Sequence, residues 1–306
     1  MSIVFYDKKR SISSHLLETI LRSLGTKKIY SSYHETRNLV LNKKEKKTEY
    51  KAKKRFFSRP VALIRKYNMK VYMINDQKDS NQKTILYIHG GAWMNQPLWV
   101  HWNFIEYMAR HLEAKIIVPI YPKIPHHNYY DAYSSLLLLY SDIIETITDR
   151  KKFTVMGDSA GANIILGLIQ MIEARNLREP QNIILLSACV DMTFSNPDIR
   201  KYEKSDPRLA PEGLKVIAEF WAGQLDVENP ILSPIFGKFN TKAKFIHFIG
   251  THDILYPDAV KFDRKLTEEG MDITTFVYPK MNHVFPVLPV KEASHARKKI
   301  IEILHS

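Results

Sequence analysis

The sequence is short of cysteine, glycine and long apolar runs. Its 306 residues include one cysteine, Cys189, which excludes an internal disulfide and a zinc site built from cysteines. Glycine occurs 11 times, below the average of roughly 7%, so each position is informative. The longest apolar runs fall well short of the roughly 20 residues that cross a bilayer. Nucleotide-binding glycine patterns are absent too, so we expect no cofactor and no metal ion.

Acidic residues are the minority, and the basic excess lies near the N-terminus. The net charge is +13, and the 15 basic and 5 acidic side chains of residues 1–55 supply +10 of it. The nearly neutral remainder argues against a nucleic-acid partner. We interpret the basic stretch at 43–55 as a solvated surface, with contact to an anionic membrane surface as the alternative. The N-terminus lacks a signal-peptide core, so a cytoplasmic location is expected.

Short apolar or β-branched runs alternate with helical patterns after residue 60. Strands are predicted at 70–74, 84–88, 115–120, 153–156, 182–190, 245–249 and 273–278. Helices are predicted at 102–112, 129–146, 160–175, 258–269 and 291–304, and an earlier amphipathic helix at 14–24. This alternation predicts an α/β fold with a mainly parallel central sheet flanked by helices. The strand spacing breaks between about 191 and 234, which indicates an insertion in the domain formed by residues 61–306.

A G-x-S-x-G motif lies between a predicted strand and a predicted helix. It consists of Gly157, Asp158, Ser159, Ala160 and Gly161. This strand–turn–helix context is the one in which the motif holds a nucleophilic serine on a sharp turn, where close neighbours must be small. We therefore predict Ser159 as a nucleophile, with Gly157, Asp158 and Gly161 supporting the turn.

Two adjacent glycines follow the strand at 84–88. His89, Gly90, Gly91 and Ala92 form the start of a loop that can present backbone N–H groups to a developing oxyanion. Together with the N–H of Ala160, this loop predicts an oxyanion hole. Which of Gly90, Gly91 and Ala92 contribute stays open by one residue, and His89 is expected to support the loop.

A serine nucleophile needs a base and an orienting carboxylate, and both are available after later strands. Asp253 follows the strand at 245–249, and His283 follows the strand at 273–278. The order Ser159, Asp253, His283 suits an α/β arrangement in which strand ends meet at one edge. The alternatives are Asp258 as the acid and His252 or His247 as the base. We expect Asp258 to cap the next helix and His247 to be a satisfied core residue.

Together these residues resemble the hormone-sensitive-lipase-like esterases of the α/β-hydrolase fold. The resemblance rests on HGGAW at 89–93, GDSAGAN at 157–163, Asp253 and His283, and extends from about residue 70 to the C-terminus. It implies Ser159 as nucleophile, Asp253 as acid and His283 as base. It also implies that the basic segment 1–60, with its helix at 14–24, joins a helical cap with the insertion at 191–234. At two positions the sequence departs from the family, which often has glycine where this chain has Ala92 and Val284.

The predicted function is a serine carboxylic-ester hydrolase that acts on small short- or medium-acyl esters through an acyl-enzyme. One alternative is an amide or formamide hydrolase with the same triad, since kynurenine formamidase-like enzymes share an HGG-x-W loop. An exopeptidase of the same fold and a non-catalytic ligand-binding homologue are the others. A small-molecule ester is the expected partner, and a monomer and a homodimer are both compatible with the sequence.

Overall fold

The computed structural model describes residues 2–43 and 50–305 of the chain. Residues 44–49, the centre of the basic stretch, lie outside the described residues, so its interpretation stays a prediction. In the described part of the chain, no helix combines the length and the apolar character that a bilayer crossing demands.

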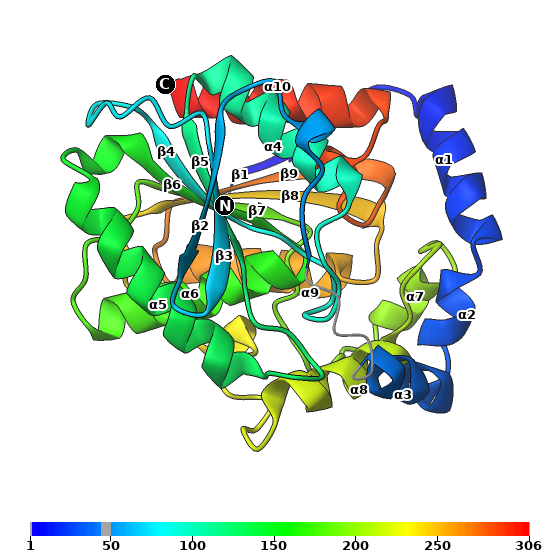
Figure 1. Cartoon of the computed structure of the whole chain (residues 1–306). Coiled ribbons are helices and arrows are strands. Elements are labelled where there is room, and N and C mark those ends of the chain that lie inside the picture. The colour runs from blue at the N-terminus through cyan, green and yellow to red at the C-terminus, as the bar shows by residue number, and fades with distance from the viewer. Residues whose placement is uncertain (1, 44–49, 306) are drawn as a thin grey trace.

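A nine-stranded sheet forms the centre of the described structure (Figure 1). Its spatial order is β1-β9-β8-β7-β6-β4-β5-β3-β2, and all neighbours are parallel except the pairs β2–β3 and β3–β5. The strands are β1 (Ser2–Phe5), β2 (Val61–Lys66), β3 (Met69–Ile74), β4 (Thr84–Ile88), β5 (Lys115–Ile120), β6 (Phe153–Asp158), β7 (Asn182–Leu186), β8 (Lys244–His252) and β9 (Ile273–Asn282). The predicted α/β fold with a mainly parallel sheet is confirmed.

Helices cover both faces of the sheet and enclose two apolar cores. Helices α4 (Trp99–Leu112) and α10 (Lys291–His305) lie over one face, whereas α5 (Tyr129–Thr146), α6 (Ala160–Ala174) and α9 (Tyr256–Glu268) lie over the other (Figure 1). Because both faces are covered, β4, β6 and β7 are buried along their whole length. This explains their almost continuous apolar sequences.

Two edge strands and several strand ends differ from the sequence-based expectation. The strands β6, β8 and β9 extend beyond their predicted ends, to Asp158, His252 and Asn282. The edge strands β1 and β2 were not expected; β1 brings the N-terminal segment into the sheet beside β9. The strand predicted at 182–190 was too long, because β7 ends at Leu186 and Ser187 has a φ of 53°. A positive φ at a non-glycine residue is incompatible with extended backbone, so the apolar run continues as an irregular segment.

Five helices gather at one side of the sheet. They are α1 (Ile12–Ser23), α2 (Thr26–Tyr30) and α3 (Tyr33–Asn42) from the N-terminal segment, and α7 (Ile199–Glu203) and α8 (Pro211–Ala222) from the segment between β7 and β8 (Figure 1). Gly213 lets α8 approach closely, since a Cβ atom there would lie 2.5 Å from the carbonyl oxygen of Tyr30. Short 3₁₀ helices complete the described elements, at Lys54–Phe56, Arg150–Lys152, Pro234–Phe236 and Phe285–Val287.

Candidate active site

Ser159 lies on the sharp turn between β6 and α6. Its φ of 50° and ψ of −120° are strained for a residue with a side chain, as the motif requires. The turn passes so close to β4 that a Cβ atom on Gly157 would lie 2.7 Å from the carbonyl oxygen of Ile88, and one on Gly161 would be closer still. Small residues at these positions therefore allow the turn that holds the Ser159 hydroxyl out from the sheet.

The structure brings Ser159, His283 and Asp253 into one hydrogen-bonded chain. The Oγ of Ser159 lies 2.8 Å from the Nε2 of His283, and the Nδ1 of His283 lies 2.8 Å from the Oδ2 of Asp253. Asp253 is fully buried and His283 is 7% exposed. The remaining Asp253 oxygen accepts the backbone N–H of Leu255 at 3.0 Å. A hydroxyl, an imidazole and a fixed carboxylate in this order can move a proton from the hydroxyl to the ring.

The charged groups around His283 make its ring easier to protonate than a histidine ring in water. Burial by itself would lower the pKa of His283, but the charge and hydrogen bond of Asp253 and the charge of Asp206 outweigh it and raise the pKa above 6.5. Asp206, from the segment between β7 and β8, is fully buried and accepts the N–H of Ile254 at 3.1 Å. This contact joins that segment directly to the loop of Asp253.

The loop after β4 places backbone donors close to Ser159. Gly91 has a φ of 122° and Ala92 a φ of 53°, so the chain bends in a way that is favourable for glycine. The N–H of Gly90 donates to Asp158 at 2.9 Å and is therefore engaged. The N–H groups of Gly91, Ala92 and Ala160 have no acceptor among the described residues. These three groups are available to an oxyanion.

Asp158 connects the glycine loop to the turn of Ser159. Its carboxylate accepts the Tyr87 hydroxyl at 2.6 Å, the Gly90 N–H and the Nε2 of His101 at 3.2 Å. Burial opposes ionisation, but His101 and these hydrogen bonds prevail and lower the pKa of Asp158 below its usual value. His89 lies beside this cluster, fully buried, with its Nδ1 2.6 Å from the carbonyl oxygen of Gly90. Burial lowers its pKa well below 6.5, so the ring is neutral.

The alternative acids and bases lie elsewhere. His247 is buried between Asp263 and the N–H of Ala188, the satisfied core position expected for it. His252 contacts Glu18 instead of a serine. Asp258 does not cap α9, contrary to expectation, because the helix begins two residues earlier at Tyr256 and Asp258 falls inside its first turn. Its carboxylate accepts the Asn196 amide at 2.6 Å.

A cavity of about 870 Å³ opens above Ser159 and His283. Its wall is mostly apolar and comes from the glycine loop, the start of α4, the residues after His283 and four of the helices at the side of the sheet, α1, α2, α3 and α8. The helix α1 contributes three apolar side chains, Leu17, Ile20 and Leu21, and Leu24 directly after it contributes a fourth. The N-terminal segment thus forms part of the wall that faces the candidate nucleophile.

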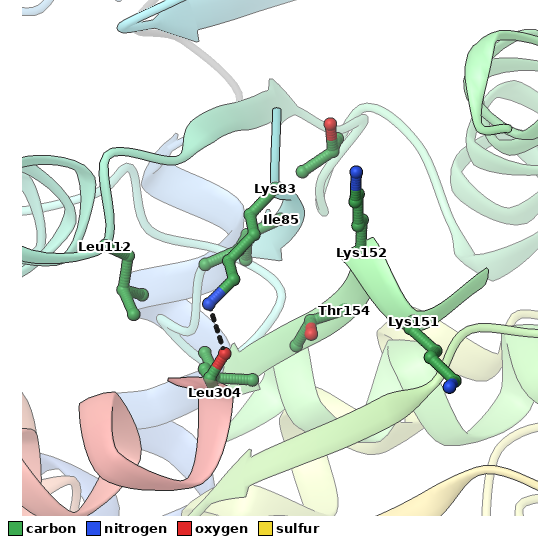
Figure 2. A pocket seen from close by; sticks show the side chains of 8 residues that line it. Lys83, Ile85, Leu112, Lys151, Lys152, Thr154 and Leu304 are labelled. Atoms are coloured by element: carbon green, nitrogen blue, oxygen red, sulfur yellow. Dashed lines mark hydrogen bonds between the residues drawn. The ribbon is translucent and has the colours of Figure 1, made fainter. Parts of the chain in front are cut away.

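A second hollow lies at the opposite ends of the strands (Figure 2). It measures about 10 Å³, and Lys83 at its side donates to the carbonyl oxygen of Leu304 at 2.6 Å. This space is too small for a substrate. Within residues 2–43 and 50–305, no three His, Cys, Asp or Glu side chains gather in a way that could hold a metal ion.

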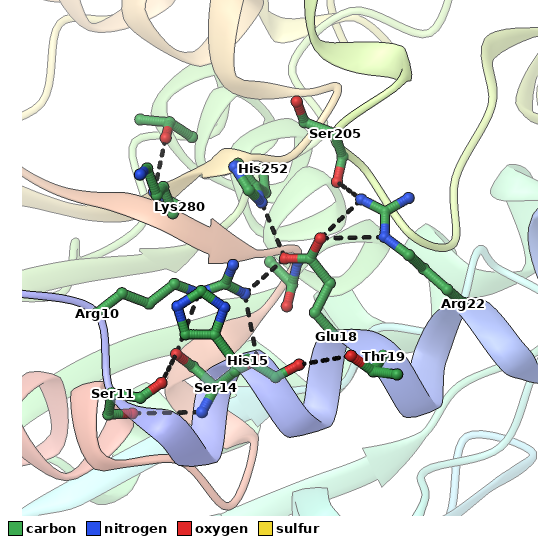
Figure 3. Close-up of polar contacts among 12 residues, drawn as sticks. Arg10, Ser11, Ser14, His15, Glu18, Thr19, Arg22, Ser205, His252 and Lys280 are labelled. Carbon is green, nitrogen blue, oxygen red and sulfur yellow. Dashed lines mark hydrogen bonds and ion pairs between the residues drawn. The ribbon is translucent and has the colours of Figure 1, made fainter.

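Glu18 on α1 connects this helix to the loops of the candidate triad, and nothing in its sequence context indicated that role. Figure 3 shows Arg10, Arg22 and His252 pointing at its carboxylate. Arg10 lies 2.5 Å away, Arg22 2.7 Å and the Nδ1 of His252 2.9 Å, and the Asn282 amide donates at 3.3 Å. His252 and Asn282 precede Asp253 and His283 directly in the chain. The docking of α1 is therefore coupled to the backbone that carries the acid and the base.

Comparisons with known proteins agree with this geometry. The model of a family described by the alpha/beta hydrolase fold matches residues 85–287. An esterase of Acinetobacter venetianus is 26% identical over 230 residues, which cover 74% of this chain and 76% of that protein. A Staphylococcus aureus structure assigned as an esterase has a TM-score of 0.84 at 25% identity, covering 91% of this chain and 95% of that one.

The fold predicted from the resemblance to hormone-sensitive-lipase-like esterases is also confirmed. The structure of an esterase from the bacterial hormone-sensitive lipase family aligns with 97% of this chain and 98% of its own, with a TM-score of 0.79 and 17% identity. The family match covers about two thirds of the sequence and contains Ser159, Asp253 and His283. The chain therefore belongs to the α/β-hydrolase fold family.

Proposed function

We propose that the protein is a serine carboxylic-ester hydrolase that cleaves small esters of short or medium acyl chains through an acyl-enzyme. The observation that carries the proposal is the chain of two 2.8 Å hydrogen bonds from Ser159 through His283 to Asp253 at the floor of the cavity. The family match and the esterase from Acinetobacter venetianus support the same reaction. A cytoplasmic location and the choice between monomer and homodimer stay predictions from the sequence.

In the first half-reaction, the Oγ of Ser159 attacks the ester carbonyl while its proton passes to the Nε2 of His283. The carbonyl oxygen becomes an oxyanion, and the free N–H groups of Gly91, Ala92 and Ala160 stabilise it. Each such donor is worth about 2.7–4 kcal/mol in a comparable enzyme. Collapse of the tetrahedral intermediate expels the alcohol, which takes the proton from His283, and leaves the acyl group on Ser159.

In the second half-reaction, water replaces the alcohol. His283 takes a proton from the water, whose oxygen attacks the acyl carbon, and returns it to Ser159 as the acid leaves. Asp253 keeps its negative charge throughout. It holds neutral His283 in the tautomer that carries its proton on Nδ1, and it stabilises the imidazolium that forms when His283 takes a second proton. The helix α1 and the segment between β7 and β8 act as a cap that excludes bulk water from the acyl-enzyme.

A fluorophosphonate probe and an ester series test this proposal. We expect the probe to label the wild type and the Ser195→Ala control, whose changed residue is exposed, but not Ser159→Ala. On p-nitrophenyl esters from acetate to decanoate, Ser159→Ala should lose on the order of 10⁶-fold in kcat, as in another serine triad. An unlabelled wild type would support a non-catalytic homologue. If the protein cleaves N-formylkynurenine faster than every ester, formamide hydrolysis would replace ester hydrolysis as the proposed function.

A further inference from the structure

Arg208 lies in the wall of the cavity that holds Ser159 and His283, and its guanidinium has no partner among the residues that the structure describes. It belongs to the segment between β7 and β8 and lines that cavity. No carboxylate, carbonyl or hydroxyl of the described residues accepts a hydrogen bond from its guanidinium, and no ion pair or aromatic ring engages it. Its side chain is only partly exposed. Since partly buried charges in proteins are normally paired, this guanidinium lacks its counterpart.

The rest of the cavity wall contains little that could serve as that counterpart. Asp158 is the only carboxylate among the described lining residues, and it is already bonded to Tyr87, Gly90 and His101. The second cation of the wall, Lys43, donates to the side-chain oxygen of Asn95 at 2.7 Å. The remaining lining is largely apolar. Among the described residues, the positive charge of Arg208 is therefore uncompensated, in surroundings of low polarity where an anion is bound more strongly than in water.

The backbone of Arg208 is held firmly relative to the candidate triad. Its N–H donates to Asp206 at 2.8 Å, and the other oxygen of Asp206 accepts the N–H of Ile254, next to Asp253. Burial raises the pKa of Tyr30 in the cavity wall, and the nearby charge of Arg208 offsets part of that rise. The segment that presents the guanidinium is thus fixed relative to the loop of Asp253.

We propose that Arg208 determines specificity by binding a carboxylate on the substrate, so that the preferred ester carries one negative charge besides its scissile bond. This inference rests on the proposed ester hydrolysis. A guanidinium presents two parallel N–H groups that match a carboxylate, and such bidentate pairs are among the stronger hydrogen bonds in proteins. One free cation suits a monoanion better than a doubly charged phosphate monoester. The net charge of +13 would also attract anionic esters toward the protein.

Two matched substrate pairs test the proposal on either side of the ester. On the acyl side, mono-p-nitrophenyl glutarate is compared with p-nitrophenyl 5-methylhexanoate, in which an isopropyl group replaces the carboxylate. On the alcohol side, 4-(butyryloxy)benzoate is compared with 4-(butyryloxy)benzamide. For one pair, we expect the wild type to prefer the anionic member at least 10-fold in kcat/KM. Arg208→Gln should reduce kcat/KM for that ester by about 10- to 100-fold, mainly through KM, the range expected of a hydrogen bond to a charged group.

Three controls separate substrate binding from other roles of Arg208. Neutral esters should change by less than threefold in Arg208→Gln, whereas a merely structural or base-tuning role would reduce both members equally and overturn the proposal. Arg208→Lys should recover part of the preference. Arg200→Gln, an exposed arginine on α7, removes the same charge outside the cavity and should leave the preference unchanged. A preference below threefold for both pairs, or one unaffected by Arg208→Gln, would also overturn it.

Binding without turnover distinguishes this proposal from the ester hydrolase on which it rests. In the Ser159→Ala protein, calorimetry should show that one monoanionic probe, glutaramate or 4-hydroxybenzoate, binds while its neutral amide, glutaramide or 4-hydroxybenzamide, does not, and that the added Arg208→Gln change abolishes this binding. If a probe binds in this way but the wild type cleaves no ester, the ester hydrolase proposal fails and the anion site stands. If the wild type cleaves esters but both monoanionic probes fail to bind, the anion site fails alone.

Discussion

The carboxylate of Glu18 provides the sharpest test of how the cap is held. Glu18→Gln keeps the shape of the side chain but removes the charge that Arg10, Arg22 and His252 share. Glu18 is 8% exposed. Its burial would raise the pKa, but hydrogen bonds from Arg22, His252 and Arg10 lower it from 4.5 to about 2.

The expected loss follows from that pKa. A shift of this size means that the folded surroundings favour the ionised carboxylate by about 3 kcal/mol. Because 42% of the Arg22 side chain is exposed, solvent weakens part of the network, and we expect about 2 kcal/mol. That energy stabilises the docked position of α1, so the opening equilibrium of the helix should rise about 30-fold in Glu18→Gln.

Hydrogen exchange monitored by mass spectrometry measures this opening directly. At neutral pH, peptides covering residues 16–24 should exchange about 30-fold faster in Glu18→Gln, while those from β6 and β7 should not change. Glu35→Gln is the matched control, because it removes an exposed carboxylate of the neighbouring α3. Less than a threefold increase, or an equal increase in Glu35→Gln, would refute the argument that Glu18 fastens α1.

The same network predicts a pH dependence of definite sign. A carboxyl group with a lowered pKa stabilises the fold above its unfolded pKa of 4.5, and this contribution disappears as the pH falls toward 2. The protection of α1 should therefore decrease over this range in the wild type. In Glu18→Gln it should be low throughout. Equal decreases in both proteins would mean that another group controls the helix.

Further predictions concern the base, the glycine loop and the cysteine. The kcat/KM for neutral esters should rise with pH with a midpoint above 6.5, because His283 must be neutral to act as a base and its pKa is raised. Asp253→Asn should lower kcat on the order of 10⁴-fold in steady-state assays, and an unchanged rate would exclude Asp253 as the orienting acid. Tyr87→Phe removes a buried hydrogen bond to Asp158 and should cost about 1–2 kcal/mol in chemical denaturation, whereas an unaltered midpoint would contradict the bracing role of Asp158. Cys189 is buried and its burial raises the thiol pKa, so iodoacetamide should leave esterase activity intact and alkylate only unfolded protein; rapid inactivation of the native protein would contradict this.

The candidate triad could be located from the sequence because each of its residues has a local signal. Ser159 lies within a glycine-containing turn between a strand and a helix, and Asp253 and His283 each follow a buried apolar run. The carboxyl ends of parallel strands lie at the same edge of a sheet. The convergence of three residues at strand ends can therefore be predicted without knowing the distances between them. The positions of the central strands could be predicted because burial on both faces gives continuous apolar sequences. Their ends could not all be predicted, since the apolar run of β7 continues beyond the strand.

The residues that hold the cap could not be found in this way. Glu18 contacts His252 from 234 positions away, and a glutamate on an amphipathic helix normally faces solvent. Arg208 likewise has no distinctive neighbours in the chain; only its place in the folded cavity shows that its guanidinium is unpaired among the described residues. The edge strand β1 escaped prediction because its four residues are all exposed and lack any alternation between buried and exposed positions. A contact between residues that are distant in sequence leaves no periodic pattern in the sequence around either residue.

The pairing of β1 with β9 has a consequence for the order in which the protein is assembled during synthesis. Ser2 pairs with Thr274, so β1 leaves the ribosome long before its partner strand β9 has been synthesised. Closing such a long loop is slow, and contacts of this kind generally form late. The helix α1, which follows β1 and bonds to the residues before Asp253 and His283, must wait as well. We expect a nascent chain to complete the turn at Ser159 long before it can shield that turn from water.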